Sequence, residues 1–157
     1  MFCAVIVCHN RVSTFFNAST YVVYNDSSVD WYTAVGKCAE KRGHLASIST
    51  MEEFNAIASM LVEFFNQQSS SSADNYGVWV DGNDDFEEGD WYCAFQGDTC
   101  GYFLWGPGYP RTSSSDCIRM YAPYNSYNSY SGVRFRDQGC TYTYLGSYVC
   151  EYKSCHG

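Results

Sequence analysis

The clearest hydrophobic pattern in the first third of the chain is that of an amphipathic helix. Asp30 stands directly before this pattern, where an aspartate side chain can accept hydrogen bonds from the free amide groups of a helix start. Gly43 follows it, where glycine commonly ends a helix. We therefore predict a helix that begins after Asp30, ends at Gly43 and buries one face. That face consists of Trp31, Ala34, Val35 and Cys38.

A second, longer helical pattern follows directly. Thr50 with Glu53, and Ser49 with Glu52, both have the spacing of a capping box, so either pair can mark the helix start. The pattern stops at Gln67, and the serine run 69–72 predicts an exposed loop. The apolar stripe of this helix is Phe54, Ile57, Ala58, Leu61 and Phe65.

The remaining patterned segments resemble strands. Residues 21–25 form a β-branched and aromatic run that is followed by the turn residues Asp26, Ser27 and Ser28. From Tyr76 onward, short aromatic and β-branched runs are separated by Gly, Asn, Asp, Ser and Pro, with no long helical period. Two helices followed by a mostly antiparallel, loop-rich sheet predict an α+β fold.

Length and charge exclude several classes of partner. The 157 residues suit one domain, and a net charge of -8 repels phosphate backbones and anionic lipid surfaces. The apolar run 2–8 is far shorter than a membrane span, and no other stretch approaches one. We therefore expect no nucleic acid partner and no membrane insertion, and we interpret residues 1–19 as a signal remnant or an extension.

The nine cysteines indicate the compartment. They include no CxxC pair and no zinc-finger spacing, which favours disulfides formed in an oxidising environment over metal or redox chemistry. Asn17-Ala18-Ser19 and Asn25-Asp26-Ser27 are acceptor sequences for N-glycosylation, which agrees with that environment. We expect a secreted or extracellular glycoprotein.

A series of short motifs resembles the C-type lectin-like domain. The resemblance covers roughly residues 20–152 and leaves 1–19 and 153–157 as terminal segments. It implies a fold in which two helices flank small antiparallel sheets and a long irregular loop region forms the ligand-binding surface. The motifs are Trp31, Ala34, Cys38, Gly43, Leu45, Ile48 and Glu53, then Val78-Trp79-Val80-Asp81, Glu88-Gly89-Asp90-Trp91, Trp105 with Pro110, Asp116-Cys117-Ile118, Asp137-Gln138-Gly139-Cys140 and Val149-Cys150-Glu151.

The resemblance also implies disulfide pairs. It pairs Cys38 with Cys150 and Cys117 with Cys140. Cys93 and Cys100 lie close together in the sequence, and we expect a local bridge between them. Cys3, Cys8 and Cys155 form an odd set, so one thiol stays free, pairs between chains in a disulfide-linked dimer, or is lost with a cleaved N-terminus.

The residues that would bind a sugar through calcium are largely replaced. In the family this site uses an oxygen ligand on each side of a cis-proline, a further carboxylate and an Asn-Asp pair. Here the proline motif is Tyr109-Pro110-Arg111, the later carboxylate position is Ser115, and the last motif is Phe135-Arg136-Asp137. Arg111 and Arg136 also bring positive charge, which repels a divalent cation. We therefore predict that the usual calcium-bridged sugar site is absent.

A neighbouring calcium site of the family has a better match. Asp84, Glu88 and Asp116 stand at three of its positions, while Thr112 and Ser115 stand where other ligands are expected. Carboxylate oxygens are suitable calcium ligands. The alternative is a solvated acidic loop, because the segment 81–90 carries six carboxylates. We expect no cofactor, or weakly bound calcium.

The segment 121–132 interleaves tyrosine with Asn and Ser, a composition typical of binding loops. The alternative is a polar loop whose tyrosines pack against the domain. No GxSxG, HExxH or phosphate-binding glycine motif is present, so we predict that the protein is no enzyme. We predict a module that binds a glycan or glycoprotein, with a protein-binding module or an acidic matrix protein as alternatives. The expected ligand-binding residues are Tyr109, Arg111, Tyr124, Tyr127, Tyr130, Arg136 and Asp137.

Overall fold

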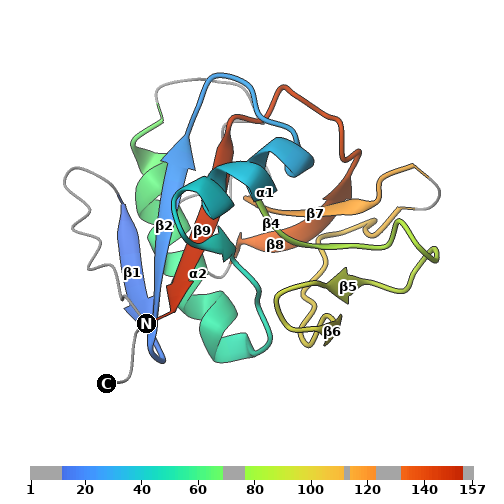
Figure 1. The fold of residues 1–157 in the computed structure, drawn as a ribbon, viewed down its shortest axis with the longest axis horizontal. Coiled ribbons are helices and arrows are strands. Elements are labelled where there is room, and N and C mark those ends of the chain that lie inside the picture. The colour runs from blue at the N-terminus through green and yellow to red at the C-terminus, as the bar shows by residue number, and fades with distance from the viewer. Residues whose placement is uncertain (1–11, 69–76, 112–113, 123–131, 154–157) are drawn as a thin grey trace.

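The computed structural model describes residues 12–68, 77–111, 114–122 and 132–153, and Figure 1 shows their arrangement. Two helices accompany a set of mostly antiparallel strands, as the α+β prediction requires. The helices are α1 (Trp31–Glu40) and α2 (Met51–Asn66). The strands are β1 (Ser13–Phe16), β2 (Ser19–Asn25), β3 (His44–Leu45), β4 (Gly77–Asn83), β5 (Tyr92–Cys93), β6 (Asp98–Thr99), β7 (Cys117–Tyr121), β8 (Arg134–Gln138) and β9 (Ser147–Lys153).

Helix α1 begins as predicted and ends differently. The Asp30 carboxylate accepts the amide hydrogen of Thr33 at 2.7 Å, which caps the helix start. At the other end, Arg42 and not Gly43 adopts the left-handed conformation, with φ at 67°. The amide groups of Arg42 and Gly43 donate to the carbonyls of Ala39 and Cys38 in a Schellman motif. Gly43 is needed for space, because a Cβ there would collide with Glu151 and Tyr152 of β9.

Helix α2 begins at the first of the two predicted caps. The Thr50 hydroxyl accepts the amide hydrogen of Glu53, so the alternative start at Ser49 and Glu52 is wrong. Glu53 in turn accepts the amide hydrogen of Ser49 at 2.6 Å and the hydroxyl hydrogen of Tyr21 at 2.7 Å. One carboxylate therefore closes the helix start and ties it to β2.

The strands form two antiparallel parts with one parallel link. In the first part, β9 pairs with β2 and β3, and β1 pairs with the other edge of β2. In the second part, β4 pairs with β5 and β7, β5 pairs with β6, and β7 pairs with β8. The link is the parallel pairing of Trp79 with Tyr148. Figure 1 shows that β5 and β6 lie on the side of the molecule away from β1, so the loops around these two strands are clear of β1.

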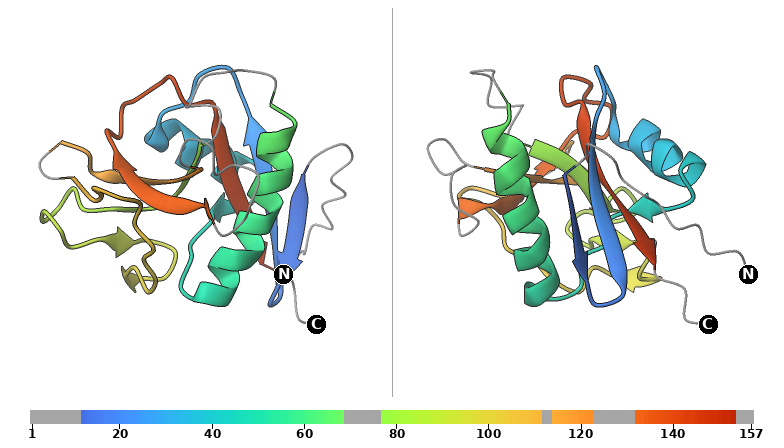
Figure 2. Two further views of the ribbon diagram at one scale, coloured as in Figure 1. Left: turned by 180° about the vertical axis from the view of Figure 1, so that it is seen from behind. Right: turned by 90° about the vertical axis from the view of Figure 1, so that its left-hand side faces the viewer.

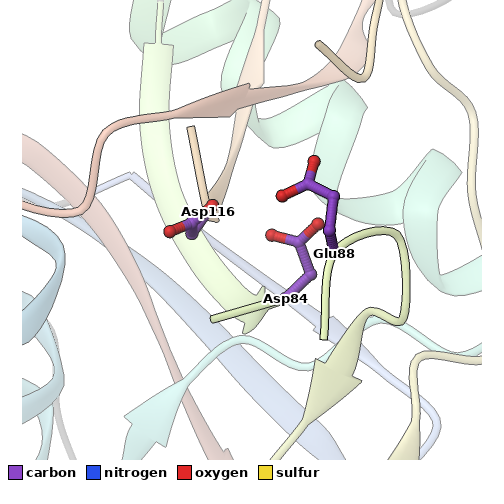
Figure 3. A group of neighbouring side chains, drawn as sticks. All are labelled: Asp84, Glu88 and Asp116. Atoms are coloured by element: carbon purple, nitrogen blue, oxygen red, sulfur yellow. The ribbon is translucent and has the colours of Figure 1, made fainter. Parts of the chain in front are cut away.

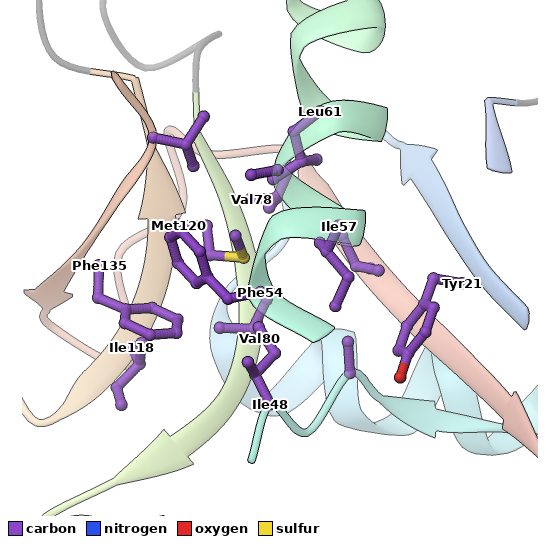
Figure 4. Close-up of a cluster of buried hydrophobic side chains, with 14 of the residues drawn as sticks. Tyr21, Ile48, Phe54, Ile57, Leu61, Val78, Val80, Ile118, Met120 and Phe135 are labelled. Atoms are coloured by element: carbon purple, nitrogen blue, oxygen red, sulfur yellow. The ribbon is translucent and has the colours of Figure 1, made fainter. Parts of the chain in front are cut away.

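The two helices cover opposite faces of the first part of the sheet, as the right-hand view of Figure 2 shows. Strand β2 serves both cores by alternation: Tyr21 and Val23 face α2, whereas Val22 and Tyr24 face α1. In the α2 core, Phe54 contacts Phe135 of β8 at a ring separation of 5.0 Å (Figure 4). This packing fixes β8, which carries candidate site residues, against the longest helix.

Three disulfides connect the described residues, in the pairs expected above. Cys38 on α1 bonds to Cys150 on β9, across a sequence separation of 112 residues. Cys117 on β7 bonds to Cys140 just after β8, and Cys93 bonds to Cys100 within the β5–β6 hairpin. Cys3, Cys8 and Cys155 lie outside the described residues.

Candidate functional site

A cluster of five residues forms where β8 meets the loop before β7. We call Tyr109, Arg111, Tyr121, Arg136 and Asp137 the Tyr109 cluster. Arg136 and Asp137 belong to β8, Tyr121 ends β7, and Tyr109 and Arg111 flank Pro110, which follows a cis peptide bond. The structure thus brings together the four expected ligand-binding residues that it describes, and adds Tyr121.

Asp137 is completely buried and forms the base of this cluster. Its Oδ2 accepts the amide hydrogen of Arg111 at 2.7 Å, and its Oδ1 lies 4.0 Å from Nε of the same arginine. Burial raises the pKa of the Asp137 carboxyl, while the hydrogen bond and charge of Arg111 and the charge of Arg136 lower it. Arg111 therefore supplies a hydrogen bond to one oxygen of this carboxylate and a nearby positive charge to the other, and that second oxygen has no hydrogen-bond partner among the described residues.

The two arginines are held on aromatic rings. The guanidinium carbon of Arg136 lies 4.6 Å from the Tyr109 ring centre and 5.7 Å from that of Tyr121, and that of Arg111 lies 5.2 Å from Tyr109. The rings of Tyr109 and Tyr121 meet edge to face. Cation–π contacts of this kind fix guanidinium groups while their in-plane N–H groups stay available for hydrogen bonds.

This arrangement does not fit a calcium ion. Calcium needs six to eight oxygen ligands, whereas Asp137 is the only carboxylate in the Tyr109 cluster and already accepts a hydrogen bond from Arg111. Two guanidinium groups lie within the same cluster and repel a divalent cation.

An acidic cluster fits a cation better. Asp84, Glu88 and Asp116 each place one carboxylate oxygen within 4.8 Å of the others, and Figure 3 shows the three side chains converging. One Asp84 oxygen accepts the amide hydrogen of Gly89 at 2.8 Å, and the other is buried without a hydrogen-bond partner among the described residues. Burial raises the pKa of Asp84 and of Asp116, and the neighbouring carboxylates raise both further. A hard cation would relieve this repulsion.

We expect calcium to stabilise the protein through this acidic cluster. With a dissociation constant on the order of 1 mM, 10 mM calcium adds about 1.4 kcal/mol to the free energy of unfolding. Thermal melting of the metal-free protein with and without calcium measures this gain. It should weaken as the pH falls toward the raised pKa values of Asp84 and Asp116, because protons then compete with calcium.

Two variants locate the ion. Glu88→Gln should remove most of the calcium response, because it neutralises one of three converging carboxylates. Asp137→Asn should leave the response intact. The opposite pattern would place the ion at the Tyr109 cluster and contradict the assignment.

A pocket beside the acidic cluster has no counterpart in the sequence predictions. It encloses about 410 Å³ between the end of β4 and the β5–β6 hairpin. Phe86 at its rim is 99% exposed. The buried Asp81 carboxylate accepts the amide hydrogen of Phe95 at 3.2 Å and so ties the hairpin to β4. The pocket is lined by Asn83, Phe86, Glu87, Asp90, Tyr92, Asp98 and Thr99.

Several predicted features lie elsewhere or have structural roles. Tyr124, Tyr127 and Tyr130 lie outside the described residues, so their role stays a prediction. Trp79 and Trp91 are buried in the two cores, and Trp105 packs against the α2 core while half-buried. No helix among the described residues has the length and hydrophobicity of a membrane span.

The geometry defines a class: a disulfide-bridged α+β domain whose second, loop-rich part carries the Tyr109 cluster and the acidic cluster. The sequence matches the family model of the Lectin C-type domain over residues 27–152. The chain therefore belongs to the C-type lectin family, as its motifs predict. Domains of this family are generally binding modules and not enzymes.

Individual relatives agree with this family assignment. The chain is 31% identical to the galactose-specific lectin nattectin of Thalassophryne nattereri over 94 residues, which are 60% of this chain and 54% of nattectin. The fold matches the C-type lectin domain of murine dendritic cell inhibitory receptor 2, solved in complex with N-glycan, with a TM-score of 0.70, 20% identity and coverage of 94% and 99%. It also matches a calcium-independent type II antifreeze protein, with a TM-score of 0.65, 20% identity and coverage of 97% and 98%.

Proposed function

We propose that this chain is an extracellular recognition module that binds a glycan or a glycoprotein through the Tyr109 cluster, without a calcium ion at Asp137. The observation that carries the proposal is the pair of ring-held guanidinium groups above a buried carboxylate, at the position where the family's sugar-linked calcium ligands are expected. Fixed N–H donors beside aromatic rings suit the hydroxyl groups and apolar faces of sugars.

The segment 123–131 is included in the proposed surface. It lies outside the described residues, but it connects β7 to β8, and the residues at the two strand ends, Tyr121 and Arg134, are paired in register. The strand ends that flank the segment are therefore Tyr121, which belongs to the Tyr109 cluster, and its pairing partner Arg134. On this ground we include Tyr124, Tyr127 and Tyr130 as further ligand contacts.

The relative nattectin supports a glycan as the ligand class. Nattectin is named as galactose-specific, and the murine receptor domain was solved with an N-glycan. The chain spans about half the length of nattectin, and its identity to the receptor domain is too low to indicate more than a shared fold. The proposal of a glycan ligand therefore rests mainly on the geometry of the Tyr109 cluster, and a binding experiment can test it directly.

A glycan array in the presence of a calcium chelator tests the proposal. Binding should persist without calcium and should fall about tenfold in Tyr109→Ala, which removes the ring that holds both arginines. Tyr127→Ala tests in the same way whether the segment 123–131 contributes to binding. Phe15→Ala is the matched control, since Phe15 is an exposed aromatic residue on β1, at the far side of the molecule (Figure 1).

Two results would contradict the proposal. Loss of binding on chelation, restored by calcium, would show that the recognition site is a calcium site. Absence of binding to any glycan, with the folded state intact, would favour the alternative of a protein-binding module.

A further inference from the structure

The Tyr109 cluster lies in a cationic stretch of an acidic chain. Residues 99–137 contain four arginines and two carboxylates, Asp116 and Asp137, whereas the whole chain has a net charge of -8. Asp116 belongs to the acidic cluster, where its carboxylate converges with Asp84 and Glu88. Asp137 lies beside Arg111 in the Tyr109 cluster, and four arginines against two carboxylates leave this stretch with a net charge of +2.

Strand pairing places three of these arginines on one face. Arg119 pairs with Arg136, and Tyr121 pairs with Arg134, in consecutive same-face positions of the β7–β8 ladder. The opposite face of the ladder carries Met120 and Phe135, which are buried in the α2 core, and the buried Asp137. One side of β7–β8 is thus mostly apolar, with one buried carboxylate, and the other is rich in guanidinium groups.

The arginines differ in depth. Arg119 is almost completely buried over Gly77 and donates to the Gln138 side chain at 3.3 Å, so it contributes positive charge from beneath the surface. The Arg111 side chain is 49% exposed. Arg136 donates to the Asp137 carbonyl and lies between two tyrosine rings, and no described carboxylate forms an ion pair with it. Arg136 is therefore positioned to bind an external anion, and the half-exposed Arg111, whose Nε lies 4.0 Å from Asp137, lies on the same Tyr109 ring and can contribute its exposed N–H groups.

We infer that this surface selects anionic glycans, meaning sugars that carry sulfate esters or carboxylates. The inference rests on the proposed function and specifies its ligand class. A planar guanidinium fork matches the paired oxygens of sulfate and carboxylate groups, and its charge strengthens the hydrogen bonds. Because the rings already hold the forks in place, little side-chain entropy is lost on binding.

The experiment compares glycans that differ only in their anionic groups, with calcium chelated throughout. One arm uses heparin and chemically desulfated, N-acetylated heparin, and the other uses a sialylated N-glycan and its asialo form. We expect the charged member of at least one pair to bind about tenfold more tightly, with an affinity that falls as salt increases. The preferred arm identifies sulfate or carboxylate as the recognised group.

Variants connect this preference to the arginines. Arg136→Gln and Arg111→Gln should each reduce binding of the charged glycan about tenfold and leave binding of its neutral partner nearly unchanged. Arg136→Lys keeps the charge without the fork and should give a smaller loss. Lys37→Gln is the matched control, because it makes the same charge change on α1.

Equal binding of charged and neutral glycans, or charge preference that survives both arginine variants, would overturn this inference while leaving the proposed function in place. Binding to no glycan at all would overturn both. Stronger binding to an acidic polypeptide such as poly-glutamate than to any charged glycan would also overturn the inference, since it would assign the arginines to a protein partner.

Discussion

Replacing Cys38 and Cys150 together with alanine is expected to lower the free energy of unfolding by about 4 to 5 kcal/mol. This bridge closes the longest loop among the disulfides of the described residues, across 112 residues, and it connects α1 to the strand at the centre of the first sheet part. A disulfide lowers the conformational entropy of the unfolded chain, and this effect grows with the length of the closed loop. For a loop of this length it amounts to about 4 to 5 kcal/mol. The loss is a large share of the stability of an ordinary domain, and the melting temperature should fall by roughly 15 °C.

The Cys93–Cys100 bridge provides the comparison. It spans only seven residues, so the double alanine variant should lose about 2 to 3 kcal/mol. Urea unfolding of both variants, followed by circular dichroism, measures the difference. Equal losses would mean that the long bridge stabilises through local packing and not through the constraint it places on the unfolded chain.

Glu151→Ala should cost about 3 to 4 kcal/mol. Glu151 is completely buried next to Cys150, and its two oxygens accept hydrogen bonds from the Ser19 hydroxyl at 2.8 Å and the Ser47 amide at 3.1 Å. Removal of the carboxylate leaves these buried donors without partners. The Lys153 ammonium, 2.5 Å from Glu151, is largely exposed and can return to water.

Two further variants make this prediction specific. Glu151→Gln keeps an acceptor for the Ser47 amide and should lose less than the alanine variant. Glu63→Ala, on the exposed face of α2, should change the stability by less than about 0.5 kcal/mol. If Glu151→Ala is no more harmful than Glu63→Ala in urea unfolding, the buried network contributes little to stability.

The sequence was most informative where one period or one motif determines an element. Helix α1 and its Asp30 cap, and helix α2 and its Thr50 cap, follow from the spacing of apolar residues and from side chains that can accept amide hydrogens. The shared strand β2 could be predicted because its residues are apolar on both faces. The disulfide pairs, in contrast, followed from the family resemblance and from closeness in sequence.

Other features depend on contacts between distant residues. Strand β1 went unpredicted because its turn uses Asn17 and Ala18 at positive φ, and alanine gives no turn signal there. Tyr121 joins the Tyr109 cluster only through the register of β7 with β8 and the course of the loop around Pro110. The pocket beside Phe86 depends on how the Cys93–Cys100 hairpin lies against β4, which no local pattern encodes.

The pairing of β1 and β9 with β2 also determines how the domain can be presented. Strand β1 and the C-terminal end of β9 lie at the left of Figure 1, away from β5 and β6, so a sequence attached before β1 or after β9 would start on the side of the molecule away from the β5–β6 hairpin. Several copies fixed to one support by the same end would then present their arginine faces together. On a polymer that repeats its anionic groups, such an array would gain avidity from weak single-site affinities, provided that the spacing of the copies matches that of the repeats.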